Sequence, residues 1–178
     1  MQMRAFRSAL AALALSLAAL PAWATAPAEV QTALPGAQKT GEASYHMLGI
    51  RLFNAEAYAV GGDFSWNAPF ALTLTYEHSA RQTTLLNRSI SEMSQRGGGN
   101  ARTLAPLRAQ LERCFPNITR GDRVTGVSTG PNTARFYFNG APRCEVNWPG
   151  FRRTFFGIWL DGRDGRAAEL SAQLRGDA

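Results

Sequence analysis

The stretch Phe151-Arg152-Arg153-Thr154-Phe155-Phe156-Gly157-Ile158-Trp159-Leu160 places three Phe, an Ile, a Trp and a Leu within ten residues. As a helix, it sets apolar side chains at spacings of three and four, which form one wide stripe. The stripe consists of Phe151, Thr154, Phe155, Ile158 and Trp159. We expect Arg152 and Arg153 to face solvent. A helix this apolar must pack against a sheet or other helices, so we predict that it closes the core.

The rest of the chain supplies the strands of that sheet. Residues 42–48 and 50–60 favour strand around a bend at Gly49, and residues 70–76 alternate apolar with polar side chains. Residues 124–129 and 133–138 are two further strands. Asn139-Gly140 is the strongest hairpin signal and leads into a return strand through Cys144.

Helical spacing appears in three other segments. Residues 79–95 and 103–115 form two helices joined by Gly97-Gly98-Gly99, and residues 166–174 form a short last helix. The order is therefore strands, a helical hairpin, strands and helices. Tight turns between strands favour antiparallel pairing, so we predict an α+β fold with an antiparallel sheet covered by helices.

Residues 1–24 have the features of a secretory signal peptide. A basic start precedes an Ala- and Leu-rich run over residues 8–20, and Ala22-Trp23-Ala24 has the small residues that signal peptidase needs. We predict cleavage near Ala24 and a periplasmic or secreted product, since the apolar run is too short to be a membrane span. Residues 25–40, rich in Ala and Pro, are expected to be a loose arm, followed by one domain over residues 41–178.

Composition excludes some classes of function. The net charge is +6, but the arginines are scattered and no recognition motif accompanies them, so we predict no nucleic-acid binding. Cys114 and Cys144 are the two cysteines, and in an oxidising compartment we expect them to form a disulfide. Catalytic thiols are the alternative, although neither cysteine lies in a CxxC motif.

Metal and cofactor motifs are sparse. His46 and His78 are the two histidines, and no HExxH motif is present, so we predict no metal site. Haem is the alternative, since a single axial His could suffice, but no motif supports it, and the absence of CxxCH excludes covalent c-type attachment. We therefore predict no cofactor.

Three polar side chains on the early strands are candidates for ligand binding. Arg51, Tyr58 and Tyr76 offer a guanidinium and two phenols that could hold the carboxylate or carbonyl of a small amphipathic molecule. The alternative is that Arg51 is solvated and the tyrosines are core residues with a wet hydroxyl.

Several motifs, taken in order, resemble the chalcone isomerase-like family in its bacterial exported branch. They run in the family's order and are spread over almost the whole chain that follows the predicted signal peptide: Leu48-Gly49-Ile50, Ala57-Tyr58-Ala59, Pro69 to Tyr76, Gly121 to Val127, Phe136 to Gly140, and Phe155 to Leu160. The resemblance implies an open-faced antiparallel β-sandwich with a ligand cleft between the sheet and the helices.

The resemblance also bears on catalysis. Plant members of the family close a chalcone into a flavanone with an arginine, a threonine and a tyrosine. Those positions fall near Gly41, Phe53 and Thr83 here, so none is matched. We therefore expect a protein without catalytic residues that binds a fatty acid-like or aromatic ligand. The alternatives are a chalcone-type intramolecular lyase or isomerase acting on another α,β-unsaturated substrate, and an envelope protein-interaction module.

Overall fold

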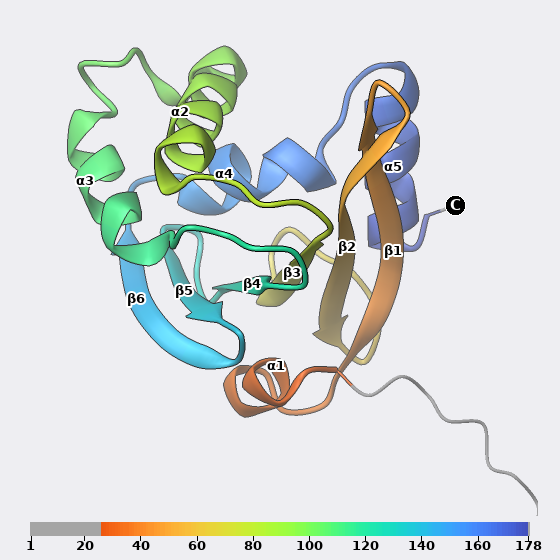
Figure 1. The fold of residues 1–178 in the computed structure, drawn as a ribbon. Coiled ribbons are helices and arrows are strands. Elements are labelled where there is room, and N and C mark those ends of the chain that lie inside the picture. The colour runs from red at the N-terminus through yellow and green to blue at the C-terminus, as the bar shows by residue number, and fades with distance from the viewer. Residues whose placement is uncertain (1–25, 178) are drawn as a thin grey trace, which may run out of the picture.

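The computed structural model describes residues 26–177, which form one sheet with helices on both of its faces (Figure 1). The strands are β1 (Ala37–Met47), β2 (Ile50–Val60), β3 (Phe70–Tyr76), β4 (Arg123–Ser128), β5 (Thr133–Phe138) and β6 (Ala141–Asn147). The helices are α1 (Ala28–Ala33), α2 (Gln82–Met93), the π-helical turn η1 (Ser94–Gly98), α3 (Ala105–Cys114), α4 (Phe151–Leu160) and α5 (Gly165–Arg175). The predicted signal peptide and its cleavage near Ala24 lie outside the described residues.

The sheet is a simple antiparallel meander in the order β1-β2-β3-β4-β5-β6. This confirms the predicted α+β class. Side chains alternate between the two faces of each strand, so pairing also fixes which residues share a face. Leu72, for example, lies between Ala57 on β2 and Gly126 on β4, and all three face the helices.

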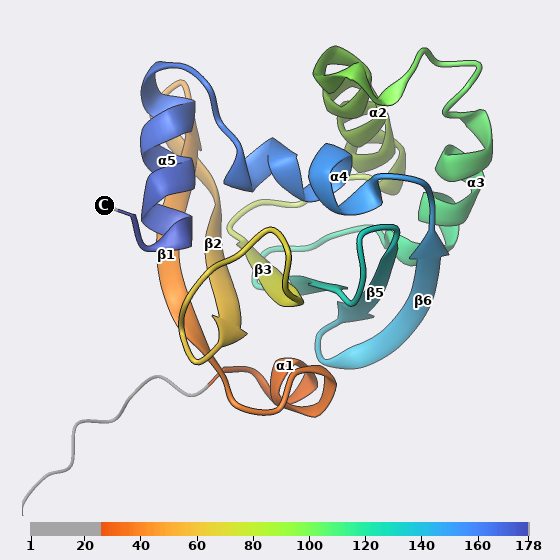
Figure 2. The same ribbon diagram turned by 180° about the vertical axis from the view of Figure 1, so that it is seen from behind.

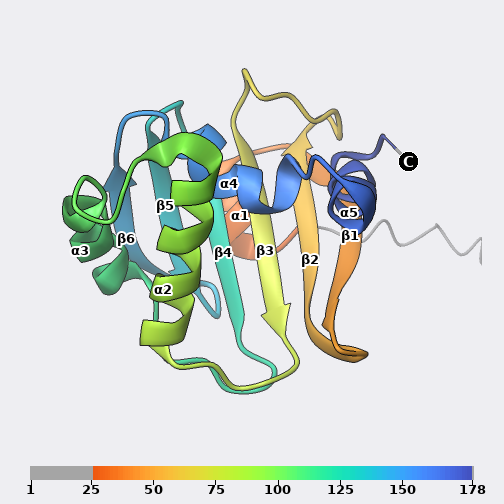
Figure 3. The ribbon, with the colours of Figure 1, turned by 90° about the horizontal axis from the view of Figure 1, so that it is seen from above.

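Helices α2, α3, α4 and α5 cover one face of the sheet, with α4 crossing the strands between α2 and α5 (Figure 3). Phenylalanines fill the space beneath α4. Phe70 meets Phe156 edge to face at 5.2 Å, and Phe136 meets Phe155 in the same way at 5.5 Å. Gly126 makes room for these rings, because a Cβ there would lie 3.1–3.3 Å from Phe136 and Phe156.

The predicted helix at residues 151–160 is present, but its buried face is rotated from the one we expected. Arg152 is only 5% exposed. Its Nε donates to Ser128 Oγ at 2.7 Å and its Nη1 donates to the Trp66 carbonyl at 2.9 Å. The expectation that Arg152 faces solvent was wrong because this side of α4 packs against β4 and the β2–β3 loop, which supply Ser128 and Trp66. The buried residues are Phe151, Arg152, Phe155, Phe156, Gly157 and Leu160.

The N-terminal segment differs from the expected loose arm over residues 25–40. Helix α1 packs against the other face of the sheet (Figure 2), with Val30 fully buried, and β1 already begins at Ala37. Pro27 is one of the prolines on which the expectation of a loose arm depends. It stands at the N-cap of α1, where the missing N–H removes no helical hydrogen bond.

Helix α1 is also held by a buried ion pair. Glu29 accepts hydrogen bonds from Arg123 Nε and Nη2, both at 3.1 Å, and from Thr125 Oγ1 at 2.9 Å. The Glu29 side chain is 1% exposed. A buried carboxylate needs such partners, and they lie on β4, so α1 is part of the domain.

Each edge strand of the sheet is held to a helix. Helix α5 lies close against β1 because Gly41 has no side chain, and Thr40 Oγ1 donates to the Leu174 carbonyl at 2.6 Å. At the opposite edge, Cys114 on α3 is bonded to Cys144 on β6. Within residues 26–177 no helix is long and apolar enough to cross a membrane.

Candidate functional site

Three aromatic side chains lie in a row on the helix-covered face, near the end of the sheet that carries the β1–β2 turn. Tyr45, Phe53 and Tyr76 come from β1, β2 and β3, and we call them the aromatic row. Tyr45 stacks on Phe53 with ring centres 4.8 Å apart, and Phe53 meets Tyr76 at 5.6 Å. All three are half-buried, whereas the next residues along the same face, such as Ala55, are fully buried. The helices therefore leave this end of the sheet incompletely covered.

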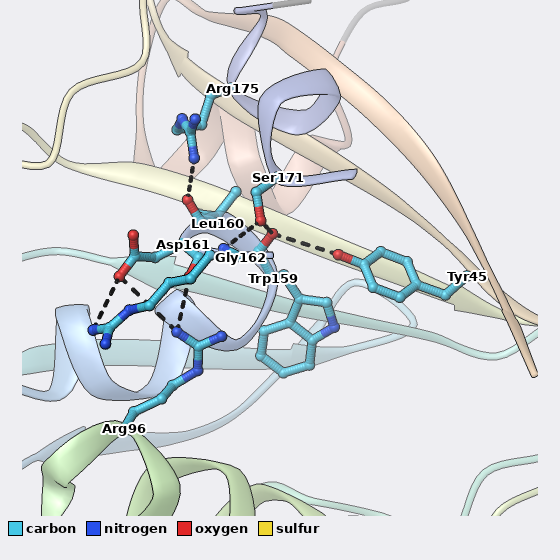
Figure 4. A network of polar contacts seen from close by, with 9 residues as sticks. Tyr45, Arg96, Trp159, Leu160, Asp161, Gly162, Ser171 and Arg175 are labelled. Atoms are coloured by element: carbon cyan, nitrogen blue, oxygen red, sulfur yellow. Dashed lines mark hydrogen bonds and ion pairs between the residues drawn. The ribbon is translucent and has the colours of Figure 1, made fainter. Parts of the chain in front are cut away.

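The C-terminal end of α4 lies beside the aromatic row, and side chains from other elements gather around it (Figure 4). The last carbonyls of a helix have no partner within the helix and attract donors and cations. Trp159 O accepts from the hydroxyls of Ser171 at 2.7 Å and Tyr45 at 3.4 Å, and Leu160 O accepts from Arg175 Nη1.

Arg96 brings a cation to the same helix end. Its Nη1 donates to the Asp161 carbonyl at 3.0 Å and lies 3.9 Å from the Asp161 carboxylate. The side chain is 18% exposed, and its Nε is buried without a hydrogen-bond partner among the described residues. The indole of Trp159 lies between Arg96 and Tyr45 in Figure 4. Arg96 therefore has donor capacity that the protein does not use.

The two phenols of the aromatic row stay neutral. Burial raises the pKa of Tyr45, and the positive charge of Arg96 opposes part of that increase. Burial likewise raises the pKa of Tyr76. Near neutral pH the site therefore holds the cations Arg96 and Arg175, the Asp161 carboxylate and two uncharged hydroxyls, so that a ligand anion would meet more positive than negative charge beside an apolar surface.

The structure does not bring the three predicted ligand-binding residues together. Tyr76 belongs to the aromatic row, and Arg51 is exposed near the β1–β2 turn. Tyr58 is 3% exposed on the opposite face of the sheet, where it packs in the cluster that contains Val30 of α1 and Val127 of β4.

Arg51 lines a separate depression of about 700 Å³ between the β1–β2 hairpin, β3 and α5. Its lining is mainly polar. Within it Ser44 Oγ donates to Asn54 Oδ1 at 2.7 Å, and Asn54 Nδ2 donates to Oε1 of Glu77, outside the lining, at 3.3 Å. These side chains already bond one another. Within residues 26–177, no group of three His, Cys, Asp or Glu is placed to hold a metal ion.

Comparison with known proteins identifies the architecture. No family model and no curated protein sequence matches this chain. Among solved structures, a fatty-acid binding protein from Arabidopsis thaliana superposes with a TM-score of 0.61, covering 80% of this chain and 88% of that one at 10% sequence identity. The chain has the chalcone isomerase-like fold. The open-faced antiparallel sheet expected from the sequence motifs is thus confirmed, and at this identity the likeness concerns the fold alone.

Sequence reasoning missed four members of the site, Tyr45, Phe53, Trp159 and Arg96. Tyr45 and Phe53 carried a usable signal, because each is a large aromatic next to small residues on the same strand face. Tyr45 follows Gly41 and Ala43 on β1, and Phe53 precedes Ala55 on β2. Arg96 carried none, since it sits in a glycine-rich turn and reaches α4 only in the folded chain.

Proposed function

We propose that this protein binds a small amphipathic carboxylate of the fatty-acid type. In this proposal the carboxylate lies at Arg96, and the apolar body lies along the aromatic row and Trp159. No chemical step is required of the protein. We also propose that it acts in the periplasm or outside the cell, after removal of residues 1–24.

The unused donor of Arg96 is the observation that carries the proposal. A guanidinium has five N–H groups in a planar fork that matches a carboxylate, and such pairs are often bidentate. Arg96 makes one close hydrogen bond, to the Asp161 carbonyl, and its Nε has none. Because Nε itself has no surface open to a ligand, a bound carboxylate would meet the exposed part of the Arg96 side chain, and one such charge-assisted hydrogen bond contributes about 1.5–3 kcal/mol.

Other observations support the class of ligand and the location. The Arabidopsis structure with this fold is a fatty-acid binding protein, and the plant catalytic arginine, threonine and tyrosine are unmatched here. The Cys114–Cys144 bond suits an oxidising compartment, as does the sequence of residues 1–24. Of the residues first selected from sequence, the proposal keeps Tyr76 and leaves Arg51 and Tyr58 outside the site.

Direct binding tests the proposal. Delipidated protein is titrated with saturated fatty acids of 12 to 18 carbons by calorimetry, and bound species are identified by native mass spectrometry. Arg96→Gln should weaken binding about ten- to a hundredfold, the equivalent of a lost charge-assisted pair. Arg135→Gln is the matched control, since Arg135 pairs with Glu145 on the exposed surface of β5 and β6.

Three results would count against the proposal. The first is absence of binding by the unaltered protein. The second is equal weakening by the Arg96 and Arg135 substitutions. The third is turnover of chalcone or another α,β-unsaturated ketone by the unaltered protein, which would favour a lyase or isomerase.

A further inference from the structure

Two hairpin turns of this protein have nearly the same φ angles but different residues. Leu48-Gly49 joins β1 to β2 with φ angles of 49° and 80°, and Asn139-Gly140 joins β5 to β6 with 49° and 85°. Asn-Gly is the usual choice for such a turn, because Asn tolerates a positive φ. A leucine is disfavoured there. The β1–β2 turn therefore keeps a residue that its backbone conformation does not favour.

That leucine is also the most exposed large apolar side chain of the described residues. Leu48 is 97% exposed, and its neighbours Met47 and Ile50 are 56% and 54% exposed. Within residues 26–177 the remaining exposed large hydrophobic residue is Val60, at the other end of β2. We call Met47, Leu48, Gly49 and Ile50 the hairpin tip. Apolar side chains are thus concentrated at one projecting point.

The charge around the hairpin tip is positive. Arg51 is the cation that flanks it directly, and residues 43–53 contain no acidic side chain. From the neighbouring segment after β3, Glu77 bonds through its backbone N–H to the Leu52 carbonyl, and its carboxylate pairs with Arg120. The nearest glutamates on the hairpin, Glu42 and Glu56, both pair with Lys39. Glu42 is five residues along β1 from Met47, or roughly 16 Å at the strand rise, which exceeds the screening length at physiological salt.

We infer that the hairpin tip docks onto a lipid bilayer rich in anionic lipids, with Met47, Leu48 and Ile50 entering the boundary between headgroups and acyl chains and Arg51 at the headgroups. Buried apolar area and attraction of a cation to anionic lipids add up in such binding, the cation contributing about 1 kcal/mol, so the expected binding is weak and reversible. A stable protein interface needs about 800 Å² on each partner, which three side chains on one turn do not supply. The tip is part of the hairpin that carries Tyr45 and Phe53, so docking brings the aromatic row to the membrane surface.

Vesicle flotation tests this inference with the processed protein, whose N-terminus is verified by mass spectrometry. The vesicles contain either phosphatidylcholine alone or phosphatidylcholine with 30% phosphatidylglycerol (about a third of the lipid, enough for a negative surface). We expect binding to the anionic vesicles and at least about fivefold weaker partitioning onto the neutral ones. Leu48→Asn should lower partitioning about tenfold, and Arg51→Gln should lower it several-fold.

The chosen substitutions separate a loss of membrane binding from a loss of folding. Asn suits a positive φ, so Leu48→Asn should leave the melting temperature unchanged or raise it. Val60→Asn, a substitution of an exposed apolar residue at the far end of β2, should not change partitioning. No fatty acid is added, so the result does not depend on the ligand site.

Two results would overturn the inference. One is failure of the unaltered protein to float with anionic vesicles. The other is equal flotation of the unaltered protein and Leu48→Asn. A dimer detected by light scattering that Leu48→Asn dissociates, without vesicle binding, would instead make the tip a self-association surface.

Discussion

Replacing Arg152 with Met should destabilise the protein strongly, although the two side chains have similar length. Arg152 is 5% exposed, so solvent cannot replace what the substitution removes. The guanidinium joins three parts of the chain through Ser128 on β4, Trp66 in the β2–β3 loop, and its own helix. It also lies 5.8 Å from the centre of the Phe70 ring.

The magnitude follows from the groups that lose a partner. In Arg152→Met, Ser128 Oγ and the Trp66 carbonyl each lose a hydrogen bond from a charged donor, at about 1–3 kcal/mol per unsatisfied group. Part of this cost is offset, because the buried charge, whose pKa is lowered chiefly by desolvation, is no longer present. We expect a net loss of about 3 kcal/mol, or roughly 6–12 °C in melting temperature for a domain of this size.

Urea unfolding followed by tryptophan fluorescence measures the loss, with the disulfide intact. The adjacent Arg153 is the matched control: it is exposed and stacks on Trp66 at 4.4 Å. Arg153→Met should therefore cost less than about 1 kcal/mol. If the two substitutions destabilise equally, or if Arg152→Met costs less than about 1 kcal/mol, the account of Arg152 as a buried cross-link is wrong.

Three further predictions concern the disulfide, the contact of α5 with β1, and the tyrosines. Reduction of the Cys114–Cys144 bond, which spans 30 residues, should lower the free energy of unfolding by about 3–4 kcal/mol; urea curves with and without reductant measure this, and coincident curves would contradict it. Gly41→Ala would place a Cβ against the Gln173 carbonyl oxygen, so α5 must move and hydrogen exchange in α5 should increase, whereas unchanged exchange would disprove the contact. Burial raises the pKa of three tyrosines, so the stability they contribute is fully present below pH of about 10 and is lost as pH rises above it. The three are Tyr45, Tyr58 and Tyr76. Absorbance titration should show their phenolates forming at higher pH than in a free tyrosine, and normal titration of every tyrosine in the folded state would refute this.

Elements whose signals are local were predicted well from the sequence. The strand at residues 133–138 has the predicted bounds because alternation and the following Asn139-Gly140 turn act within a few residues. The helix at residues 151–160 was likewise predicted in place, since its apolar content requires burial whatever its partner. The direction of its buried face was not predicted correctly, because this direction depends on the elements that pack against the helix.

Elements held by distant partners were predicted less well. Helix α1 has six residues and little helical signal of its own, and its Glu29 is bound by Arg123, 94 positions away. Short isolated helices are marginal in water, so tertiary packing decides whether this segment is ordered. The same applies to Arg152, whose partner Ser128 is 24 positions away.

The candidate site shows most clearly the difference between what local sequence signals determine and what distant contacts determine. The sequence alone determined that aromatic and cationic side chains lie on the early strands, because strand alternation and composition are local properties. Only the tertiary structure decided which of them meet. Strand register places Tyr58 and Tyr76 on opposite faces of the sheet, and the fold brings Arg96 to Asp161, 65 positions along the chain, and Tyr45 to Trp159, 114 positions along it. Such contacts depend on how α4 and η1 pack over the sheet, and no spacing within one segment encodes them.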